Sequence, residues 1–218
     1  MTLLYPDLSN NNWGGSEWTS EGNDRLLNFL ESLRPAGIHG IVHKVSQGSD
    51  FQDPYWQTCR EWCEHNDTSW LGYHYVSTDD PAAQVQRFAV NNGGPNVMLD
   101  WEQGSGDFSN FWPLVNAFNA AGVNVSLLYL PHWYWGDIGE PDLSGLDQIQ
   151  LVSSAYPGGV GDPQQIYDWC GGDGGEGWGS YGGATPAVWQ FTDHAVVDGI
   201  PVDCNAYKGD NLDVLFTS

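Results

Sequence analysis

Short apolar runs alternate with amphipathic segments along the first two-thirds of the chain. The apolar runs have the length and composition of strands, which we predict at residues 2–5, 40–45, 69–76, 96–101 and 123–130. Between them, apolar residues recur at helical spacing, and we predict helices at 25–33, 53–65, 81–90 and 108–121. Strands separated by helices are typical of βαβ units and a parallel sheet.

The last third of the chain has a different pattern. Strands are predicted at 149–153, 186–191 and 202–205 without full helices between them, and the glycine-rich segment 170–184 predicts an exposed, mobile loop. Neither an internal repeat nor an interdomain linker is evident. We therefore predict one catalytic domain over residues 1–218. Its fold class is α/β: an irregular barrel of about five β/α units and about three further strands, with its site at the C-terminal mouth of the strands.

Aromatic residues are abundant, with 12 Trp, 10 Tyr and 8 Phe in 218 residues. Most must serve the core, but Trp and Tyr also form flat platforms in sugar-binding clefts, so the excess favours a carbohydrate ligand. The 28 acidic residues against 6 basic ones give a formal charge of −22. This charge argues against nucleic acid and against anionic membrane surfaces as partners.

Targeting and metal signals are absent from the sequence. No charged-then-apolar leader and no run approaching a membrane span occurs, so we expect synthesis in a cytoplasm and release by another route. The cysteines form no C-x-x-C pair, and we expect buried free thiols, with a Cys170–Cys204 bridge as the open alternative. His39 and His43 lack a third ligand, and no metal is expected.

The strongest chemical signal is Asp100-Trp101-Glu102 at the end of an apolar run. Residues two apart on a strand point to the same face, with Cα atoms ~7 Å apart. Neighbouring acids oppose each other's ionisation, so one is expected to retain a proton near neutral pH. Glycoside hydrolysis needs such a protonated acid beside a charged partner. An isolated D-x-E is more often two solvated acids at a strand end.

Two further acids favour a site over that simpler interpretation. Asp7 follows the first predicted strand, and Asp203 lies in the last. First and last strands of a closed barrel are neighbours, so both acids are expected to face the same mouth as Asp100 and Glu102.

In this order and spacing, the motifs resemble those of glycoside hydrolase family 25, the Chalaropsis-type lysozymes of bacteria and their phages. The resemblance runs from about Leu4 to Leu215. It rests on YPDLSN at 5–10, IVHKVSQG at 41–48, GYHY at 72–75, AAQVQRF at 82–88, MLDWE at 98–102, LY at 128–129, VWQF at 188–191 and VDCN at 202–205.

The resemblance implies a retaining N-acetylmuramidase that acts on peptidoglycan glycan strands without a cofactor. Glu102 would be the general acid, and Asp100 would orient the substrate's 2-acetamido group, whose oxygen or an enzyme carboxylate is the nucleophile. Asp7 and Asp203 would complete the acidic floor. By position, the resemblance implies Tyr75, Tyr129 and Trp189 as substrate-binding aromatic residues.

The resemblance also implies a phage endolysin, released to the wall by a holin. No second wall-binding module is evident, which leaves open such a domain outside this chain. Gln47 stands where the family often has an acid, and the glycine-rich segment before Trp189 resembles an insertion.

Two other interpretations remain. A chitinase-like glycosidase would share the D-x-E, although the longer D-x-x-D-x-D-x-E pattern is absent. An inert wall-binding module would retain the barrel and the aromatics without turnover, and the presence of all four acids argues against it.

Overall fold

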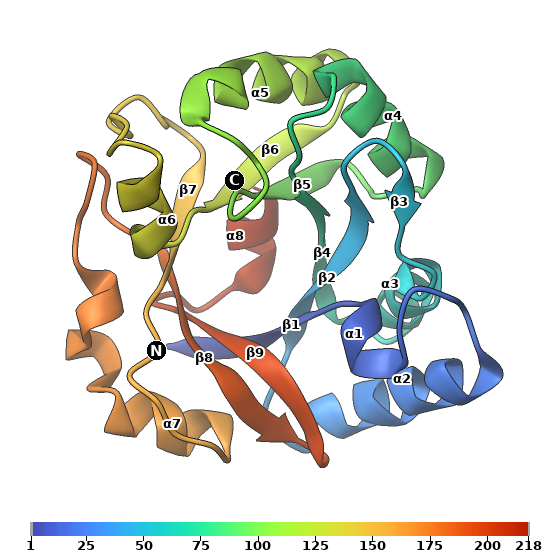
Figure 1. The fold of residues 1–218 in the computed structure, drawn as a ribbon. Coiled ribbons are helices and arrows are strands. Elements are labelled where there is room, and N and C mark those ends of the chain that lie inside the picture. Colours follow the sequence, from blue (N-terminus) through green and yellow to red (C-terminus); the bar gives the residue numbers. More distant parts are fainter. Residues whose placement is uncertain (1, 218) are drawn as a thin grey trace.

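Eight strands close into a barrel in the computed structural model, which describes residues 2–217 (Figure 1). All neighbours among these eight are parallel except β9 (Ile200–Tyr207), which runs antiparallel to both β8 (Val188–Val197) and β1 (Leu3–Leu8). A short β3, Phe51–Gln52, pairs with the end of β2. The prediction of an irregular β/α barrel is confirmed. In order around the barrel, the strands are β1 (Leu3–Leu8), β2 (Gly40–Gln47), β4 (Ser69–Tyr75), β5 (Asn96–Asp100), β6 (Asn124–Tyr129), β7 (Gln150–Ser154), β8 (Val188–Val197) and β9 (Ile200–Tyr207).

Most helices lie on the outside of the barrel, and α1 (Asn10–Trp13), α2 (Ser20–Leu33), α4 (Pro81–Val90) and α7 (Pro163–Trp169) begin at a side-chain cap. The Thr19 side chain accepts the backbone N–H of Gly22, so α2 begins earlier than its apolar periodicity predicted. Asp80 caps α4 in the same way, and Pro81 follows in its first turn. The helices are α1 (Asn10–Trp13), α2 (Ser20–Leu33), α3 (Trp56–His65), α4 (Pro81–Val90), α5 (Phe111–Ala120), α6 (His132–Asp137), α7 (Pro163–Trp169) and α8 (Leu212–Thr217), with a 3₁₀ turn at Phe108–Asn110 before α5.

The last third is more regular than predicted. A helix, α7, does connect β7 to β8, and its signal is the Asp162-Pro163 pair: Asp162 accepts from the Gln165 backbone N–H. The expectation of no full helix there is wrong. A seven-residue helix is too short to show a clear apolar period, which is why the pattern missed it.

The glycine-rich segment, residues 170–184, is a packed cover and not simply an exposed loop. It forms 3₁₀ turns at Gly172–Gly174 and Glu176–Trp178. A Cβ on Gly175 or Gly177 would come within 2.3 or 2.1 Å of the Trp189 ring, so these glycines allow the backbone to lie directly on the indole. The prediction of an exposed loop is therefore wrong for the part of the segment that covers Trp189.

The barrel interior is filled by side chains at one end and open at the other. Tyr5, Val42 and Met98 pack inside the barrel with Leu212, Leu215 and Phe216 of α8. The Phe216 ring meets Tyr5 edge-on, with centroids 5.4 Å apart. Figure 1 shows α8 seated within the ring of strands. The helix closes the end opposite the strands' C-terminal mouth.

The four cysteines are free: Cys59, Cys63 and Cys204 are buried, and Cys170 is partly exposed. This agrees with the expectation of unpaired thiols. No helix within residues 2–217 is both long and apolar enough to cross a membrane.

Candidate active site

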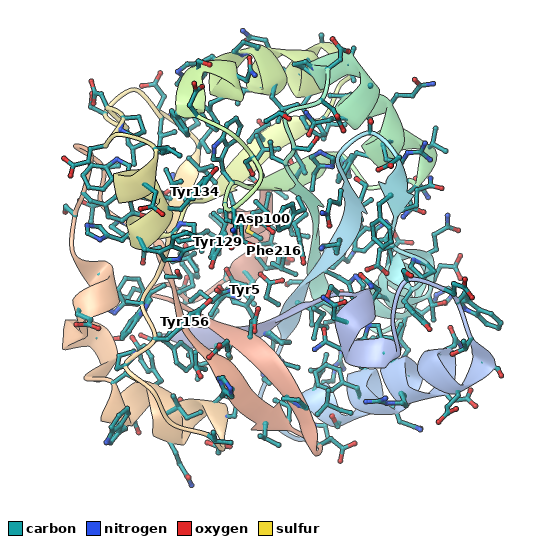
Figure 2. The ribbon with its side chains drawn as sticks, in the orientation of Figure 1. Tyr5, Asp100, Tyr129, Tyr134, Tyr156 and Phe216 are labelled. Atoms are coloured by element: carbon teal, nitrogen blue, oxygen red, sulfur yellow. The ribbon has the colours of Figure 1, made fainter. Side chains whose placement is uncertain are left out.

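The structure brings the four predicted acids together. Asp7, Asp100, Glu102 and Asp203 line one cavity of about 220 Å³ at the barrel mouth, which we call the acidic cavity. Its other lining residues are Ser9, Asn11, Lys44, Tyr73, Tyr75, Tyr129, Tyr156 and Gln190. Figure 2 shows Asp100, Tyr129 and Tyr156 over the centre of the barrel.

Strand register explains why these acids converge. Asp100 is the last residue of β5 and pairs with Tyr75 on one side and Tyr129 on the other. Asp7 of β1 pairs directly with Asp203 of β9, because the chain's first and last strands close the barrel. Directly paired residues project from the same face of a sheet. The cavity therefore has one acidic wall from β5 and another from β1 and β9.

Tyr129, Tyr156 and Gln190 form a hydrogen-bonded network that reaches Asp7. The Tyr129 hydroxyl donates to Gln190 Oε1 at 2.9 Å, and the Tyr156 hydroxyl donates to the same oxygen. With its oxygen occupied by two donors, Gln190 directs its Nε2 toward Asp7 Oδ2, 3.5 Å away. The Gln190 amide is buried, so its orientation is set by these contacts.

The predicted aromatic residues separate into two groups. Tyr75 and Tyr129 line the acidic cavity, as the prediction requires. Trp189 does not: its side chain is fully buried beneath the glycine-rich segment, and its Nε1 donates to the Ala155 carbonyl. The prediction that Trp189 contacts substrate is wrong, because close packing of Gly175 and Gly177 covers the ring. Tyr156 was not predicted.

This chain is similar to known proteins in its structure, but comparisons of its sequence alone reveal no such similarity. No protein-family model matches the sequence, and no curated protein is detectably similar to it. A muramidase from Trichobolus zukalii has a TM-score of 0.70 at 16% identity, over 98% of each chain. A family GH25 lysozyme from Aspergillus fumigatus has a TM-score of 0.67 at 19% identity, over 99% of each chain.

The similarity extends to phage proteins. The endolysin catalytic domain from a bacteriophage of Listeria monocytogenes has a TM-score of 0.66 at 17% identity, over 100% of this chain and 98% of that one. The chain has the fold of the family GH25 lysozymes. Fungal, bacterial and phage lysozymes share that fold with it to similar degrees, so the similarity does not assign the chain to one of these sources.

Burial raises the pKa of all four acids in the acidic cavity, the Asp100–Glu102 pair among them. Burial raises the pKa of Asp100 well above its usual range, and the charges of Glu102 and Asp7 raise it further. Burial also raises the pKa of Glu102, while the Lys44 charge and Tyr75 oppose the rise. Asp100 is buried and Glu102 only half-buried, so Glu102 is the member of the pair that a ligand reaches first.

Lys44 is the single basic side chain among the described residues that line the acidic cavity. Its ammonium lies 4.9 Å from the centre of the Tyr75 ring and donates to Gln47 Oε1 at 3.3 Å. Because Gln47 is neutral, it leaves the Lys44 charge available to the acids. That charge lowers the pKa of Asp7, Asp100 and Glu102.

Removing the Lys44 charge is expected to change how the acids of the cavity titrate. In a Lys44→Met variant, the pKa of Glu102 rises, so Glu102 retains its proton to higher pH. An NMR titration of the carboxyl groups should show this rise. Lys44→Arg, which keeps the charge, is the control and should titrate like wild type. Titrations that coincide for Lys44→Met and wild type would contradict this role.

The charged carboxylate of Asp203 is expected to lower the free energy of unfolding of the protein at neutral pH. Burial and the charges of Asp193 and Glu102 raise its pKa from 3.8 to about 6. Between these values the folded state binds more protons than the unfolded state, so stability falls as pH rises through this window. Asp203→Asn removes that loss. We expect the variant to be about 1–3 kcal/mol more stable than wild type at pH 7 and little different at pH 3.

Urea unfolding at the two pH values measures this effect, with Asp210→Asn as a control at an exposed position. A variant whose stability advantage is the same at pH 3 and pH 7 would show that the gain comes from packing and not from the carboxylate charge.

Proposed function

We propose that the chain is a lysozyme that hydrolyses the β-1,4 bond between N-acetylmuramic acid and N-acetylglucosamine in bacterial peptidoglycan. The observation that carries this proposal is the convergence of four carboxyl groups on one cavity at the mouth of a lysozyme-fold barrel. An inert wall-binding module would not need proton-retaining acids, which are unfavourable to bury.

Glu102 acts as the general acid. Its raised pKa favours the protonated form, and it is the more accessible acid of the pair. It donates its proton to the glycosidic oxygen as the bond from that oxygen to the anomeric carbon breaks. The leaving sugar departs as an alcohol, and Glu102 becomes a carboxylate that later accepts a proton from the attacking water.

Asp100 orients the 2-acetamido group of the sugar whose bond is cleaved. Asp100 Oδ1 is buried and has no hydrogen-bond partner among the described residues, so it is available to a substrate N–H. A fixed acetamido group places its oxygen to attack the anomeric carbon on the face opposite the leaving group. Water then opens the resulting ring from the first face. Two inversions give net retention.

The products of wall digestion test this proposal. Purified peptidoglycan is digested, the fragments are reduced with borohydride, and the reduced sugar is identified. Reduced muramic acid is the expected result. Reduced glucosamine would make the bond specificity wrong. Chitin oligomers serve as a parallel substrate, and preferential cleavage of chitin would favour a chitinase. No new reducing ends on any wall type would leave wall binding without catalysis.

We further propose that the chain is the catalytic part of a phage endolysin that reaches the wall through a holin. Its fold similarity to a Listeria phage endolysin domain supports this, although fungal and bacterial muramidases are equally similar. Expression inside a susceptible bacterium, with and without a co-expressed holin, tests the route. Lysis only with the holin is expected, and lysis without it would contradict the route.

A further inference from the structure

A second cavity, of about 460 Å³, lies at the same mouth and has no role in the chemistry above. We call it the aromatic pocket. Its lining comes from three parts of the chain: α6, the end of β7 and the glycine-rich segment. Its lining side chains include His132, Trp133, Ser154, Glu176, Ser180 and Tyr181.

The aromatic pocket continues from the acidic cavity along two paths. Ser153, Ser154 and Ala155 line the pocket, and the next residue in the chain, Tyr156, lines the acidic cavity. On the other side, Trp133 meets Tyr134 edge-on at 5.4 Å, and the Tyr134 hydroxyl donates at 2.9 Å to the carbonyl of Gly106, four residues after Glu102. Figure 2 shows Tyr134, Tyr129 and Tyr156 along this side of the mouth.

The walls of the pocket are fixed before any ligand binds. Ser153 Oγ donates to the Gly177 carbonyl and ties the glycine-rich segment to β7. The Tyr181 hydroxyl donates to the Leu130 carbonyl, and the His132 ring meets the Tyr181 ring edge-on at 5.0 Å. A preformed pocket costs a ligand little ordering of the protein.

The lining chemistry suits a neutral sugar. Trp133 is 50% exposed and presents an indole surface, and Ser154 and Ser180 supply hydroxyl groups. Glu176 is the single acidic side chain in the lining, and no Lys or Arg lines the pocket within residues 2–217. Carboxylates of a wall peptide would be repelled by Glu176 in this pocket and by the four acids of the adjacent acidic cavity. The charge of the lining therefore disfavours a peptide.

We infer that the aromatic pocket is a further subsite for an N-acetylhexosamine unit of the glycan strand, with Trp133 as its platform. The inference rests on the proposed lysozyme function, because the pocket adjoins that cavity. The glycine-rich segment thereby has a role: it supplies the second wall of a groove that extends beyond the catalytic acids. Longer glycans should bind more tightly than fragments too short to reach the pocket.

Glycan fragments of increasing length test the inference by hydrolysis. The wild-type protein should gain about tenfold in kcat/KM once a fragment is long enough to fill the pocket. Trp133→Ala should lose that gain through a higher KM. Trp112→Ala is the matched control, because Trp112 is 44% exposed on α5 and lines neither cavity. Equal length dependence in Trp133→Ala and wild type would overturn the inference.

Two further measurements separate sugar from peptide. The Trp133→Ala defect should be the same at low and at high salt, since a neutral sugar does not need a charge partner. Walls whose stem peptides have been removed by an amidase should show the same Trp133→Ala defect as intact walls. A defect that disappears with the peptides, or that is lost at high salt, would assign the pocket to the peptide instead.

Binding without turnover keeps the test independent of the proposed chemistry. Calorimetry with chitohexaose should show about tenfold weaker binding to Trp133→Ala than to wild type, and unchanged binding to Trp112→Ala. Equal affinities overturn the subsite. Failure of the proposed function has a different signature: the wild-type protein would release no reducing ends from walls, whatever the calorimetric result.

Discussion

A Glu102→Gln variant is expected to lose hydrolysis of purified walls by ~100-fold or more. The substitution keeps the size of the side chain and removes the proton that the leaving oxygen needs. It also removes one of the charges that raise the pKa of Asp100. The variant should still bind walls, because the aromatic and neutral lining of the acidic cavity is unchanged. The release of reducing ends and co-sedimentation with walls measure the two properties separately.

The control is Glu61→Gln, on the exposed surface of α3. It should hydrolyse walls at the wild-type rate. Near-normal turnover in Glu102→Gln would remove Glu102 from the role of proton donor and leave Asp100 as the alternative. Loss of both turnover and wall binding would instead point to a disturbed cavity, which a thermal unfolding measurement would detect as a lower Tm.

The alternation of apolar strands and amphipathic helices was sufficient to predict the barrel. Buried parallel strands read as continuous apolar runs, and the 96–101 and 123–130 predictions agree with β5 and β6 to within a residue or two. The short helices α6 and α7 and the terminal α8 were missed. Each has six or seven residues, fewer than two turns, and its position depends on contacts with distant strands.

Convergence of the four acids followed from one topological argument. Closure of a barrel makes its first and last strands neighbours, and Asp7 does pair with Asp203. Tyr156 had no such signal, because it follows β7 in an irregular segment whose course the sequence does not specify. The prediction that Trp189 contacts substrate was wrong for the opposite reason. Its motif is on a strand, but the two glycines that bury it are 12 and 14 residues earlier in the chain.

Lys44 and Gln190 line the acidic cavity, but the sequence did not indicate what they do there. Both lie within motifs that support the family resemblance, yet neither was predicted as a site residue. Their importance emerges from contacts: Lys44 is the cation among the acids, and Gln190 connects Tyr129 and Tyr156 to Asp7. Such connections join four different strands, and local sequence patterns do not specify them.

Phe216→Ala is expected to lower the free energy of unfolding by about 3–5 kcal/mol. Phe216 is 2% exposed and packs inside the barrel against Tyr5, so its removal leaves a cavity bounded by strands that cannot easily move inward. Six residues form α8, too few for a helix that is stable by itself, so its position depends on this packing. Urea unfolding measures the loss.

Val214→Ala is the matched control on the same helix, because Val214 is 59% exposed. It should change the free energy of unfolding by less than about 0.5 kcal/mol. Because α8 closes the end of the barrel away from the acids, folded Phe216→Ala protein should retain wild-type hydrolysis at low temperature. A loss below about 1 kcal/mol would mean that α8 is not needed to fill the barrel. A loss of hydrolysis without loss of stability would mean that the closed end of the barrel positions the acids.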